Sequence, residues 1–382
     1  MSGINIHINN TPFTFQSRDK KILESLKKYK VFDKIYYLGI WESPLKKSEK
    51  IDSVRTIIRF KTRLITTPSN NFFKMIKLFE WFIKILIYLR KKPADCVNCH
   101  SLPLLPFCVL LKIIKKSKLV YDTHELETET HVTRGLRKFF SKIIEWYFIR
   151  FVDEVIVVSH SMANWYKKKY SLEKVWVVRN IPHALKSTQV KSNLLRRKFN
   201  IQSDEKLFLY QGVIADGRGI VTLLRVFSKI KKDNHIVFMG FGELCDEVKK
   251  YSLKNDNIHY HQAVKPDELQ KYSSSADVGV NLLENSCLNH FYCLPNKIWE
   301  YLNGMVPILV CDYPEMKKVV DQFQCGWTIS PDEINIQKKI EKISFTEINK
   351  KKKNVIKMRG KFGWHEEEKT LYKIYQNLGF IN

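Results

Sequence analysis

The stretch from Leu294 to Asp312 limits most narrowly how this chain of 382 residues can fold. Pro295 suits the first turn of a helix, because its ring fixes φ near the helical value, and Gly304 supplies a stop. The apolar run from Val306 to Val310 then predicts a strand that is covered on both faces, as in a parallel sheet. A short helix followed directly by a buried strand indicates an open α/β sheet.

Two charged residues lie early in that helix. Lys297 and Glu300 are three positions apart, so they share one face near the helix N-terminus, where free N–H groups and the helix dipole favour an anion. The cation can meet a diphosphate there, while the carboxylate accepts hydrogen bonds from two ribose hydroxyls. This layout predicts a nucleotide site, and the alternative is an ordinary Lys–Glu pair on a solvated helix surface.

The positive charge of the chain is unevenly distributed. The formal net charge is +26, and residues 1–185 hold 34 basic and 16 acidic side chains, a net of +18. Nucleic acid, an anionic membrane and a phosphorylated substrate are all attracted by such a field, and charge alone does not separate them. No alternation of aromatic and basic residues typical of a nucleic-acid surface accompanies it, so we expect no nucleic-acid partner.

The eight cysteines are scattered, which is typical of reduced protein in the cytoplasm. Cys96, Cys99 and His100 could begin a zinc site, but no second Cys/His pair at metal spacing follows. The sequence therefore predicts no bound metal.

The first half of the chain has the pattern of a doubly wound sheet. Strands are expected at 4–8 and 34–40 around a helix at 19–30. Residues 72–89 are mostly apolar but carry a charged stripe of Lys74, Lys77, Glu80 and Lys84, which argues against a membrane span. This helix either packs in the domain or lies in a membrane interface.

Two further strands of the first half end at polar residues. Strands at 96–100 and 118–122 flank a helix at 102–114, and His124 and Glu125 directly follow the second strand. Ligands bind at the carboxyl ends of parallel strands, so both side chains are candidates for a binding cleft. The pattern continues with a helix at 136–150, a strand at 154–158, a helix at 161–170 and a strand at 175–178.

A second α/β unit begins near Lys206. A strand at 207–210 leads into a loop with Gly212, Arg218 and Gly219, and a helix starts at Ile220. Glycine lets backbone approach a phosphate closely, and Arg218 adds a planar fork of donors. Further strands are expected at 236–242, 258–261 and 278–283, with a helix at 266–272 and a last helix at 364–378. The basic run at 350–353 is interpreted as a solvated helix end.

Several motifs, taken in order, make the chain resemble the GT-B glycosyltransferases, and specifically glycosyltransferase family 4. The resemblance covers nearly the whole chain and rests on the ordered set. The motifs are Tyr121-Asp-Thr-His-Glu125, Val152-Asp-Glu-Val-Ile-Val-Val-Ser159, Val178-Arg-Asn-Ile-Pro182, Tyr210-Gln-Gly212, Arg218-Gly-Ile220, Ala276-Asp-Val278 and Leu294-Pro-Asn-Lys through Gly304-Met-Val-Pro307.

The resemblance implies roles for individual residues. Gly212, Arg218, Gly219, Lys297 and Glu300 would bind the donor nucleotide, with Arg218 and Lys297 also stabilising the departing diphosphate. His124 stands where the family places a residue near the reacting sugar. The sugar or the acceptor would contact a further set, namely Glu125, Asn289, Tyr292 and Asn296.

Two positions depart from the family pattern. The first glutamate of the usual Glu-x7-Glu motif is Tyr292 here, and the usual basic residue after the first glycine of the loop is Val213. A subgroup with a Leu-Pro-Asn-Lys-x-x-Glu-Tyr helix lacks that first acid. An inactive relative that acts as a binding or scaffold subunit is therefore an alternative.

The resemblance implies two Rossmann-like domains that face a cleft. The acceptor domain would span residues 1–185, with the helix at 364–382 packing back near it, and the donor domain residues 186–363. The implied activity is a retaining, metal-independent, hexosyltransferase-like transfer from a UDP- or GDP-linked sugar. The implied acceptor is a glycan or polyprenyl-diphosphate-linked glycan in surface polysaccharide biosynthesis.

The remaining expectations concern location and the competing enzyme. The basic first half predicts a cytoplasmic protein that binds an anionic membrane peripherally, on its cytoplasmic face. A non-hydrolysing sugar-nucleotide epimerase shares the two-domain architecture and is the other candidate enzyme.

Overall fold

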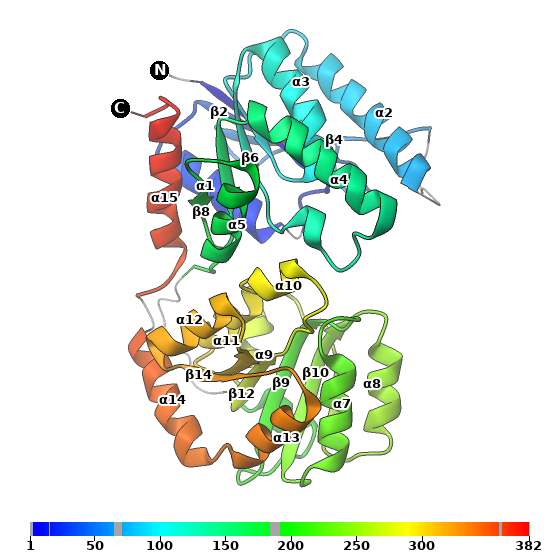
Figure 1. The fold of residues 1–382 in the computed structure, drawn as a ribbon, viewed down its shortest axis with the longest axis vertical. Coiled ribbons are helices and arrows are strands. Elements are labelled where there is room, and N and C mark those ends of the chain that lie inside the picture. Colours follow the sequence, from blue (N-terminus) through cyan, green and yellow to red (C-terminus); the bar gives the residue numbers. More distant parts are fainter. Residues whose placement is uncertain (1–2, 15, 65–70, 184–191, 359–360, 382) are drawn as a thin grey trace. The chain divides into compact units, whose positions relative to one another are not determined.

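The computed structural model describes residues 3–14, 16–64, 71–183, 192–358 and 361–381. The chain forms two compact units, the first made of residues 1–180 and 366–382 and the second of residues 181–365 (Figure 1). The first domain boundary was expected at 185, which lies among residues 184–191, outside the described residues. The chain returns from unit 2 to unit 1 after residue 365, and the donor domain was expected to end at 363.

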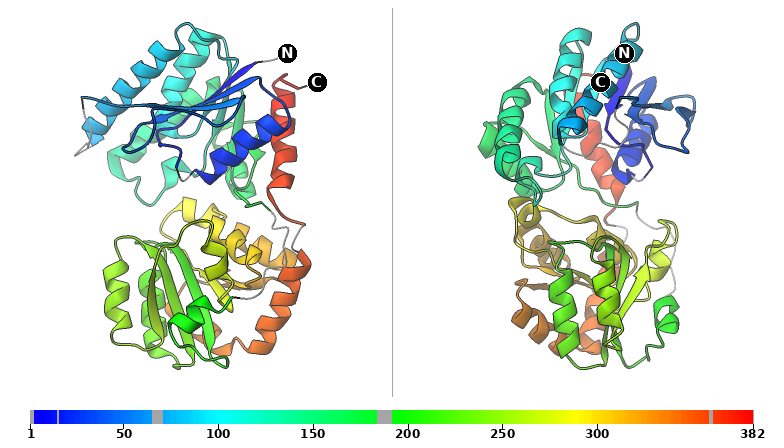
Figure 2. Two further views of the ribbon diagram at one scale, coloured as in Figure 1. Left: turned by 180° about the vertical axis from the view of Figure 1, so that it is seen from behind. Right: turned by 90° about the vertical axis from the view of Figure 1, so that its right-hand side faces the viewer.

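Unit 1 is built on an eight-stranded sheet in the order β3-β4-β2-β1-β5-β6-β7-β8, with helices on both faces (Figures 1 and 2). All neighbouring strands are parallel except β3 and β4. The strands are β1 (Ile4–Ile8), β2 (Lys34–Ile40), β3 (Ser48–Lys50), β4 (Arg55–Phe60), β5 (Cys96–Cys99), β6 (Lys118–Asp122), β7 (Glu154–Val157) and β8 (Trp176–Val177). The strand order reverses between β1 and β5, so the carboxyl ends of these two strands form the topological switch point of the sheet.

The helices of unit 1 include both strongly packed and partly exposed elements. They are α1 (Ser17–Lys28), α2 (Asn71–Leu89), α3 (Leu105–Lys115), α4 (Gly135–Phe148), α5 (His160–Tyr170) and α15 (Trp364–Asn377), with short 3-10 turns at Leu102–Leu104, Glu127–Glu129 and Ile149–Phe151. The Ser159 side chain accepts the backbone N–H of Met162, so Ser159 caps α5.

The last helix, α15, returns to unit 1. Its Glu367 accepts hydrogen bonds from the backbone and the guanidinium of Arg179, and Tyr375 is fully buried, where its hydroxyl accepts from Asn98 at 2.8 Å. This helix is drawn in red beside α1 in Figure 1. Buried apolar area and a paired carboxylate together hold it against the sheet.

Helix α2 buries some of its apolar residues in unit 1 and exposes others. Trp81 and Ile85 are fully buried, and the Trp81 indole donates to the carbonyl of Gly39 at 3.0 Å. Glu80 of the charged stripe accepts the backbone N–H groups of Arg63 and Leu64, so this residue binds a loop of unit 1. None of the described helices combines the length and apolar character needed to cross a bilayer.

Unit 2 contains a six-stranded, fully parallel sheet in the order β11-β10-β9-β12-β13-β14. This is the doubly wound order 3-2-1-4-5-6, and the order reverses between β9 and β12. The strands are β9 (Lys206–Val213), β10 (Asn234–Phe241), β11 (Ile258–Gln262), β12 (Val278–Asn281), β13 (Ile308–Cys311) and β14 (Gly326–Ile329).

Nine helices flank this sheet in the described part of unit 2 (Figure 1). They are α6 (Leu194–Lys198), α7 (Ile220–Lys229), α8 (Cys245–Ser252), α9 (Leu269–Ser273), α10 (Leu288–Tyr292), α11 (Asn296–Asn303), α12 (Pro314–Phe323), α13 (Glu333–Lys342) and α14 (Phe345–Met358). The basic run at 350–353 lies inside α14, so its interpretation as a helix end is wrong; Ile348 and Val355 bury one side of α14 and carry the helix through the run.

The stretch from Leu294 to Asp312 folds with small shifts from the expectation. Pro295 is the N-cap of α11 and not part of its first turn, and β13 begins at Ile308 because Pro307 has no N–H to give to the ladder. Gly212 is the penultimate residue of β9 and not part of a loop. Gly279 of β12 leaves room for the ring of Tyr301, which a Cβ there would meet at 2.3 Å.

Candidate functional site

The switch point of unit 2 brings the carboxyl end of β9 against α11. A Cβ placed on Gly212, whose φ is +113°, would lie 3.6 Å from the Lys297 Nζ. The α7 helix starts at this same edge after Gly219, which has φ of +71°. A Cβ on Gly219 would meet the carbonyl oxygen of Leu282 at 2.0 Å, so this position requires glycine.

Two cations share this edge without a carboxylate of their own. Within the described residues, neither Arg218 nor Lys297 takes part in an ion pair, and both side chains are half-buried. Burial of its ammonium lowers the pKa of Lys297 to about 7; the charge of Arg218 lowers it further and Glu300 opposes the shift. The Nζ of Lys297 also lies 4.1 Å from the centroid of the Tyr210 ring. An anion bound between the two cations would relieve their repulsion.

Glu300 is held by a neighbour other than Lys297. The Gln211 side-chain amide donates to Glu300 Oε2 at 2.7 Å, and Ser273 Oγ donates to Gln211 Oε1 at 2.6 Å. Tyr301 accepts the backbone N–H of Gln211 at 2.9 Å and donates to the carbonyl of Leu209. The carboxylate of Glu300 is therefore fixed beside the end of β9, and the simple Lys–Glu pair on the helix surface is not formed.

The other predicted residues of unit 2 are placed on two short helices. Asn289 is buried and Tyr292 half-buried on α10, and Asn296 is the exposed first residue of α11. Sequence reasoning missed Gln211 as an orienting residue. Its position between Tyr210 and Gly212, at the end of a buried strand, was the available signal.

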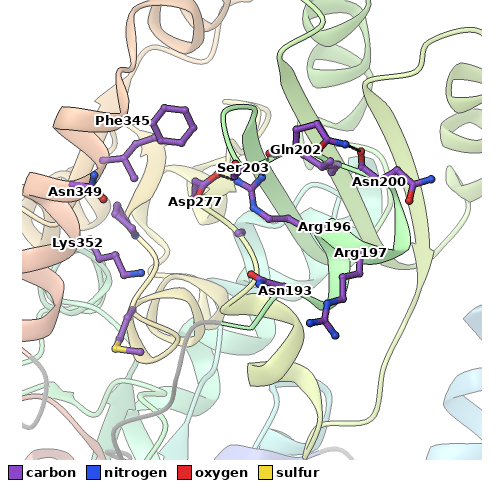
Figure 3. Close-up of a pocket in the computed structure, with 15 residues that line it drawn as sticks. Asn193, Arg196, Arg197, Asn200, Gln202, Ser203, Asp277, Phe345, Asn349 and Lys352 are labelled. Carbon is purple, nitrogen blue, oxygen red and sulfur yellow. Dashed lines mark hydrogen bonds and ion pairs between the residues drawn. The ribbon is translucent and has the colours of Figure 1, made fainter.

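One pocket of unit 2 lies at the opposite edge of its sheet. It has a volume of about 500 Å³, and Figure 3 shows Arg196, Asp277 and Lys352 among its lining residues. Asp277 directly precedes β12, so this pocket opens where strands begin. Arg196 already binds Asp277 and the carbonyl oxygens of Gln202 and Glu205. The pocket therefore does not belong to the candidate site.

In unit 1, His124 lies at the switch point together with His100, Asp122 and Arg18, to which the sequence gave no role in the binding cleft. It is one-third exposed and follows β6, whereas His100 follows β5 and is buried. Asp122 at the end of β6 receives a two-pronged contact from Arg18, with Nη2 to Oδ1 at 2.7 Å and Nε to Oδ2 at 3.1 Å. Burial alone would raise the pKa of Asp122, but Arg18 holds it below its ordinary value.

A pocket of about 350 Å³ in unit 1 adjoins His124. It is lined by His124, Glu125, Glu127, Thr130, Val132, Thr133 and Arg137. Glu125 is exposed there, and Glu127 accepts the backbone N–H of Leu102 at 2.7 Å. Burial raises the pKa of Glu127 to about 8. Glu127 was not predicted from the sequence, because its burial arises from packing against Leu102.

Cys96 and Cys99, which were weighed as the start of a zinc site and set aside, do not form one. Cys96 and Cys99 are buried inside the sheet, and burial raises the pKa of both thiols. Their neighbour His100 instead lies close to Asp19 and His124.

Two family descriptions match most of the chain. Residues 44–181 match the model of Glycosyltransferase Family 4, and residues 191–361 match that of Glycosyl transferases group 1. The chain is 24% identical over 263 residues to a chitobiosyldiphosphodolichol beta-mannosyltransferase of Kluyveromyces lactis, a match that covers 59% of this chain and 57% of that protein.

Solved structures of glycosyltransferases share the fold. A sucrose-phosphate synthase of Thermosynechococcus elongatus superposes with a TM-score of 0.77 at 14% identity over 99% of both chains. HepE of Anabaena in complex with UDP and glucose gives 0.73 at 11% identity over 98% of this chain and 99% of that one. WaaG, a glycosyltransferase of lipopolysaccharide biosynthesis, gives 0.69 at 13% identity over 97% and 99%.

Three findings agree with one another. They are the two doubly wound units, the glycine at the end of β9 beside the helix with Lys297 and Glu300, and the family matches over 44–181 and 191–361. The chain belongs to the GT-B glycosyltransferases of family 4.

Proposed function

We propose that the protein transfers a sugar from a nucleotide-linked donor to a glycan acceptor. The observation that carries this proposal is the pair of cations Arg218 and Lys297 at the switch point of unit 2, beside the fixed carboxylate of Glu300. Two unpaired cations next to Gly212 suit a diphosphate, and a carboxylate nearby suits a ribose diol. HepE, a structural neighbour, was solved in complexes with UDP and with UDP-glucose.

The chemistry proposed for these residues is stabilisation of a leaving diphosphate. Negative charge grows on the diphosphate as the bond to the sugar breaks, and donors that are already in place stabilise it without reorganisation. Arg218 offers a planar fork and Lys297 a point charge. His124 would contact the reacting sugar, and Asn289, Tyr292 and Asn296 the sugar or the acceptor, as the family resemblance implies. Retention of configuration rests on that resemblance alone.

The acceptor is proposed to enter by the pocket of unit 1 that His124 and Glu125 line. This pocket also contains the exposed cation Arg137 and the protonatable Glu127. A cation and a neutral acid suit an acceptor with both an anionic group and hydroxyls. A polyprenyl-diphosphate-linked glycan has this chemistry and would serve surface polysaccharide biosynthesis.

Such an acceptor would require the protein to reach a membrane, and the surface of unit 1 supports peripheral binding. Helix α4 buries Glu145, which accepts hydrogen bonds from three tyrosine hydroxyls, yet leaves Phe139, Phe140 and Trp146 more than half exposed. Exposed apolar residues on the neighbouring α2 and α3 extend this surface. With the net charge of +18 over residues 1–185, it fits an anionic bilayer on the cytoplasmic side.

A thermal-shift screen tests the donor proposal first. Full-length protein is mixed with UDP-, GDP- and ADP-linked sugars and with the free diphosphates, because a ligand of the native state raises the melting temperature by mass action. We expect one nucleotide class to stabilise the wild type and to stabilise Glu300→Gln less, because that variant loses the carboxylate assigned to the ribose. No stabilisation by any nucleotide would refute a working donor site and would favour an inactive relative.

A second assay separates a transferase from an epimerase. The stabilising sugar nucleotide is incubated with the protein and no acceptor, and the sugar is analysed by NMR. An epimerase interconverts two sugar nucleotides under these conditions, whereas the transferase leaves the donor unchanged until an acceptor is added. Epimerisation would overturn the proposal.

A further inference from the structure

Helices α4 and α5 of unit 1 both end beside a second pocket of that unit, which has a volume of about 400 Å³. The hydroxyl of Tyr170 in its wall is used elsewhere, because it donates to the buried Glu145 at 2.6 Å. The pocket thus combines apolar surface with three polar side chains from the two helix ends. Its lining residues are Trp146, Ile149, Arg150, Lys169, Tyr170, Ser171 and Leu172.

The three polar side chains of this pocket, Arg150, Lys169 and Ser171, are all hydrogen-bond donors. All three are exposed, and none forms a hydrogen bond or an ion pair within the part of the chain that the structure describes. The guanidinium carbon of Arg150 lies 4.5 Å from the centroid of the Trp146 ring and 5.2 Å from that of Tyr147. These aromatic faces hold the guanidinium in place before a ligand binds.

The charge around the pocket favours an anion. Residues 146–150 and 167–174 hold five basic side chains and one acidic side chain, a net charge of +4. The C-terminal end of α5 by itself disfavours an anion, because its free carbonyl groups carry partial negative charge. Lys167 and Lys168 lie with Lys169 in that last turn and offset this effect. The one acidic residue, Glu173, does not line the pocket.

The pocket lies at the end of an exposed apolar stripe on α4. Phe139, Ile143 and Trp146 are spaced by four and three residues, so they share one face of the helix, and they are 59%, 44% and 57% exposed. Arg150 follows four residues after Trp146, in the 3-10 turn that extends α4. Apolar, aromatic and cationic side chains thus succeed one another as acyl chains, interface and phosphates do in a bilayer.

We propose that this pocket binds the headgroup of one anionic glycerophospholipid, with Arg150 and Lys169 on the phosphate and Ser171 on the polar group beside it. An arginine fork and a lysine point charge are the usual partners of phosphate. A volume of about 400 Å³ is in the usual range for small-ligand pockets and leaves room for a polar group beyond the phosphate. A choline headgroup is disfavoured, because its cation would face two cations of the protein.

This inference rests on the membrane binding proposed above and adds to it a site for a single lipid. Two other arrangements use the same cations. In diffuse attraction, any exposed basic residue near the surface counts equally, and no pocket is filled. In a free-anion site, phosphate binds without a lipid.

A calorimetric titration distinguishes the ligands. Full-length protein is titrated with dihexanoylphosphatidylglycerol below its micelle concentration, with the corresponding phosphatidylcholine, and with inorganic phosphate. We expect one equivalent of the phosphatidylglycerol to bind and the other two ligands to bind at least about tenfold more weakly. Inorganic phosphate or phosphatidylcholine that binds as tightly as the phosphatidylglycerol overturns the proposal, and so does a lack of saturable lipid binding.

Variants locate the binding in the pocket. Arg150→Gln with Lys169→Gln should weaken binding of the short-chain lipid about tenfold or more, and Arg150→Lys, which keeps the charge but loses the fork, should weaken it less. Lys46→Gln with Lys47→Gln is the matched control, because these exposed lysines precede β3 at the opposite edge of the same sheet from β8. Circular dichroism checks that each variant folds. The proposal is overturned if the two double variants bind the lipid equally well.

Co-sedimentation relates the site to a membrane. Vesicles of phosphatidylglycerol and phosphatidylcholine are used at about 150 mM salt, and Arg150→Lys should sediment less than the wild type although its charge is the same. Equal sedimentation of these two proteins overturns the lipid site and leaves the proposal of membrane binding standing. A wild type that stays in the supernatant overturns both.

Discussion

The Nζ of Lys297 lies 4.1 Å from the centroid of the Tyr210 ring, at the end of the strand that carries Gly212. This position deprives the ammonium of water and gives it an aromatic face in exchange. A lysine held in this way is nearly balanced between its charged and neutral forms at neutral pH, which makes its charge sensitive to any anion that binds there.

The first prediction is that nucleotide affinity depends on pH through Lys297. With a pKa of about 7 in the free protein, the ammonium is present below pH 7 and lost above it. A bound diphosphate raises this pKa, so binding takes up a proton and the dissociation constant should rise by up to about tenfold per pH unit above pH 7. Calorimetry at several pH values measures this slope.

Lys297→Arg is the matched control for that slope. An arginine stays charged throughout the accessible range, so its affinity should vary little with pH. Equal slopes for the wild type and Lys297→Arg would show that another group titrates.

The second prediction is that Arg218→Ala and Lys297→Ala lower kcat more than they raise KM. Contacts that strengthen only as the diphosphate departs affect turnover, and the loss of one such donor costs about 10²–10³ in kcat. Steady-state kinetics with the donor found by thermal shift measures both constants. Arg225→Ala, an exposed position on α7, serves as the control and should behave like the wild type. A normal kcat with a raised KM would contradict the role in leaving-group stabilisation.

The third prediction is that Glu300→Gln weakens nucleotide binding while the fold is kept. The change removes the charge that accepts from Gln211 and would accept from the ribose, a loss of about 1–3 kcal/mol. Calorimetry with the free nucleoside diphosphate measures the difference. Glu333→Gln, far along the chain on α13, should leave affinity unchanged; unaltered affinity in Glu300→Gln would remove the ribose assignment.

The fourth prediction concerns stability and Glu127. Burial raises the folded-state pKa of Glu127 to about 8, so the folded chain holds a proton that the unfolded chain releases near its ordinary carboxyl pKa. The stability that Glu127 contributes is complete below that ordinary value and is lost as pH rises through 8. Glu127→Gln keeps an acceptor for the N–H of Leu102 and has no proton to lose. The melting temperature of this variant should therefore rise relative to that of the wild type from about pH 5 to about pH 8.

Glu125→Gln is the control for this measurement, because Glu125 is exposed two residues away. If the melting curves of the wild type and Glu127→Gln run parallel across that pH range, Glu127 does not hold a proton in the folded state.

The fifth prediction is salt-sensitive binding to anionic vesicles. Each basic residue near such a surface contributes about 1 kcal/mol, and apolar insertion adds a part that salt does not release. Co-sedimentation with anionic and neutral vesicles at low and high salt measures both parts. Phe139→Ser with Trp146→Ser should reduce the salt-resistant part, whereas Leu253→Ser, at a more exposed apolar residue of unit 2, should not. Protein that stays in the supernatant with anionic vesicles at low salt refutes membrane binding.

The elements that the sequence located most accurately are buried strands with strong flanking signals. Strands β1, β2 and β6 have the predicted bounds, because their apolar patterns end at clear turn residues. The two strands between 48 and 60 were not predicted, since β3 is fully exposed and has no apolar pattern to find. Edge strands of this kind are determined by a partner strand and not by their own sequence.

By itself, the sequence determined the α11 helix with Lys297 and Glu300, the glycines of β9 and the α7 start, and the family, because each is a local pattern of a few residues. Only the tertiary structure decided which groups meet. Glu300 is oriented by Gln211 and not by Lys297, and Asp19, His100 and His124 converge although they follow three different strands. The physical reason is that parallel strands place their carboxyl ends side by side, whatever their separation along the chain.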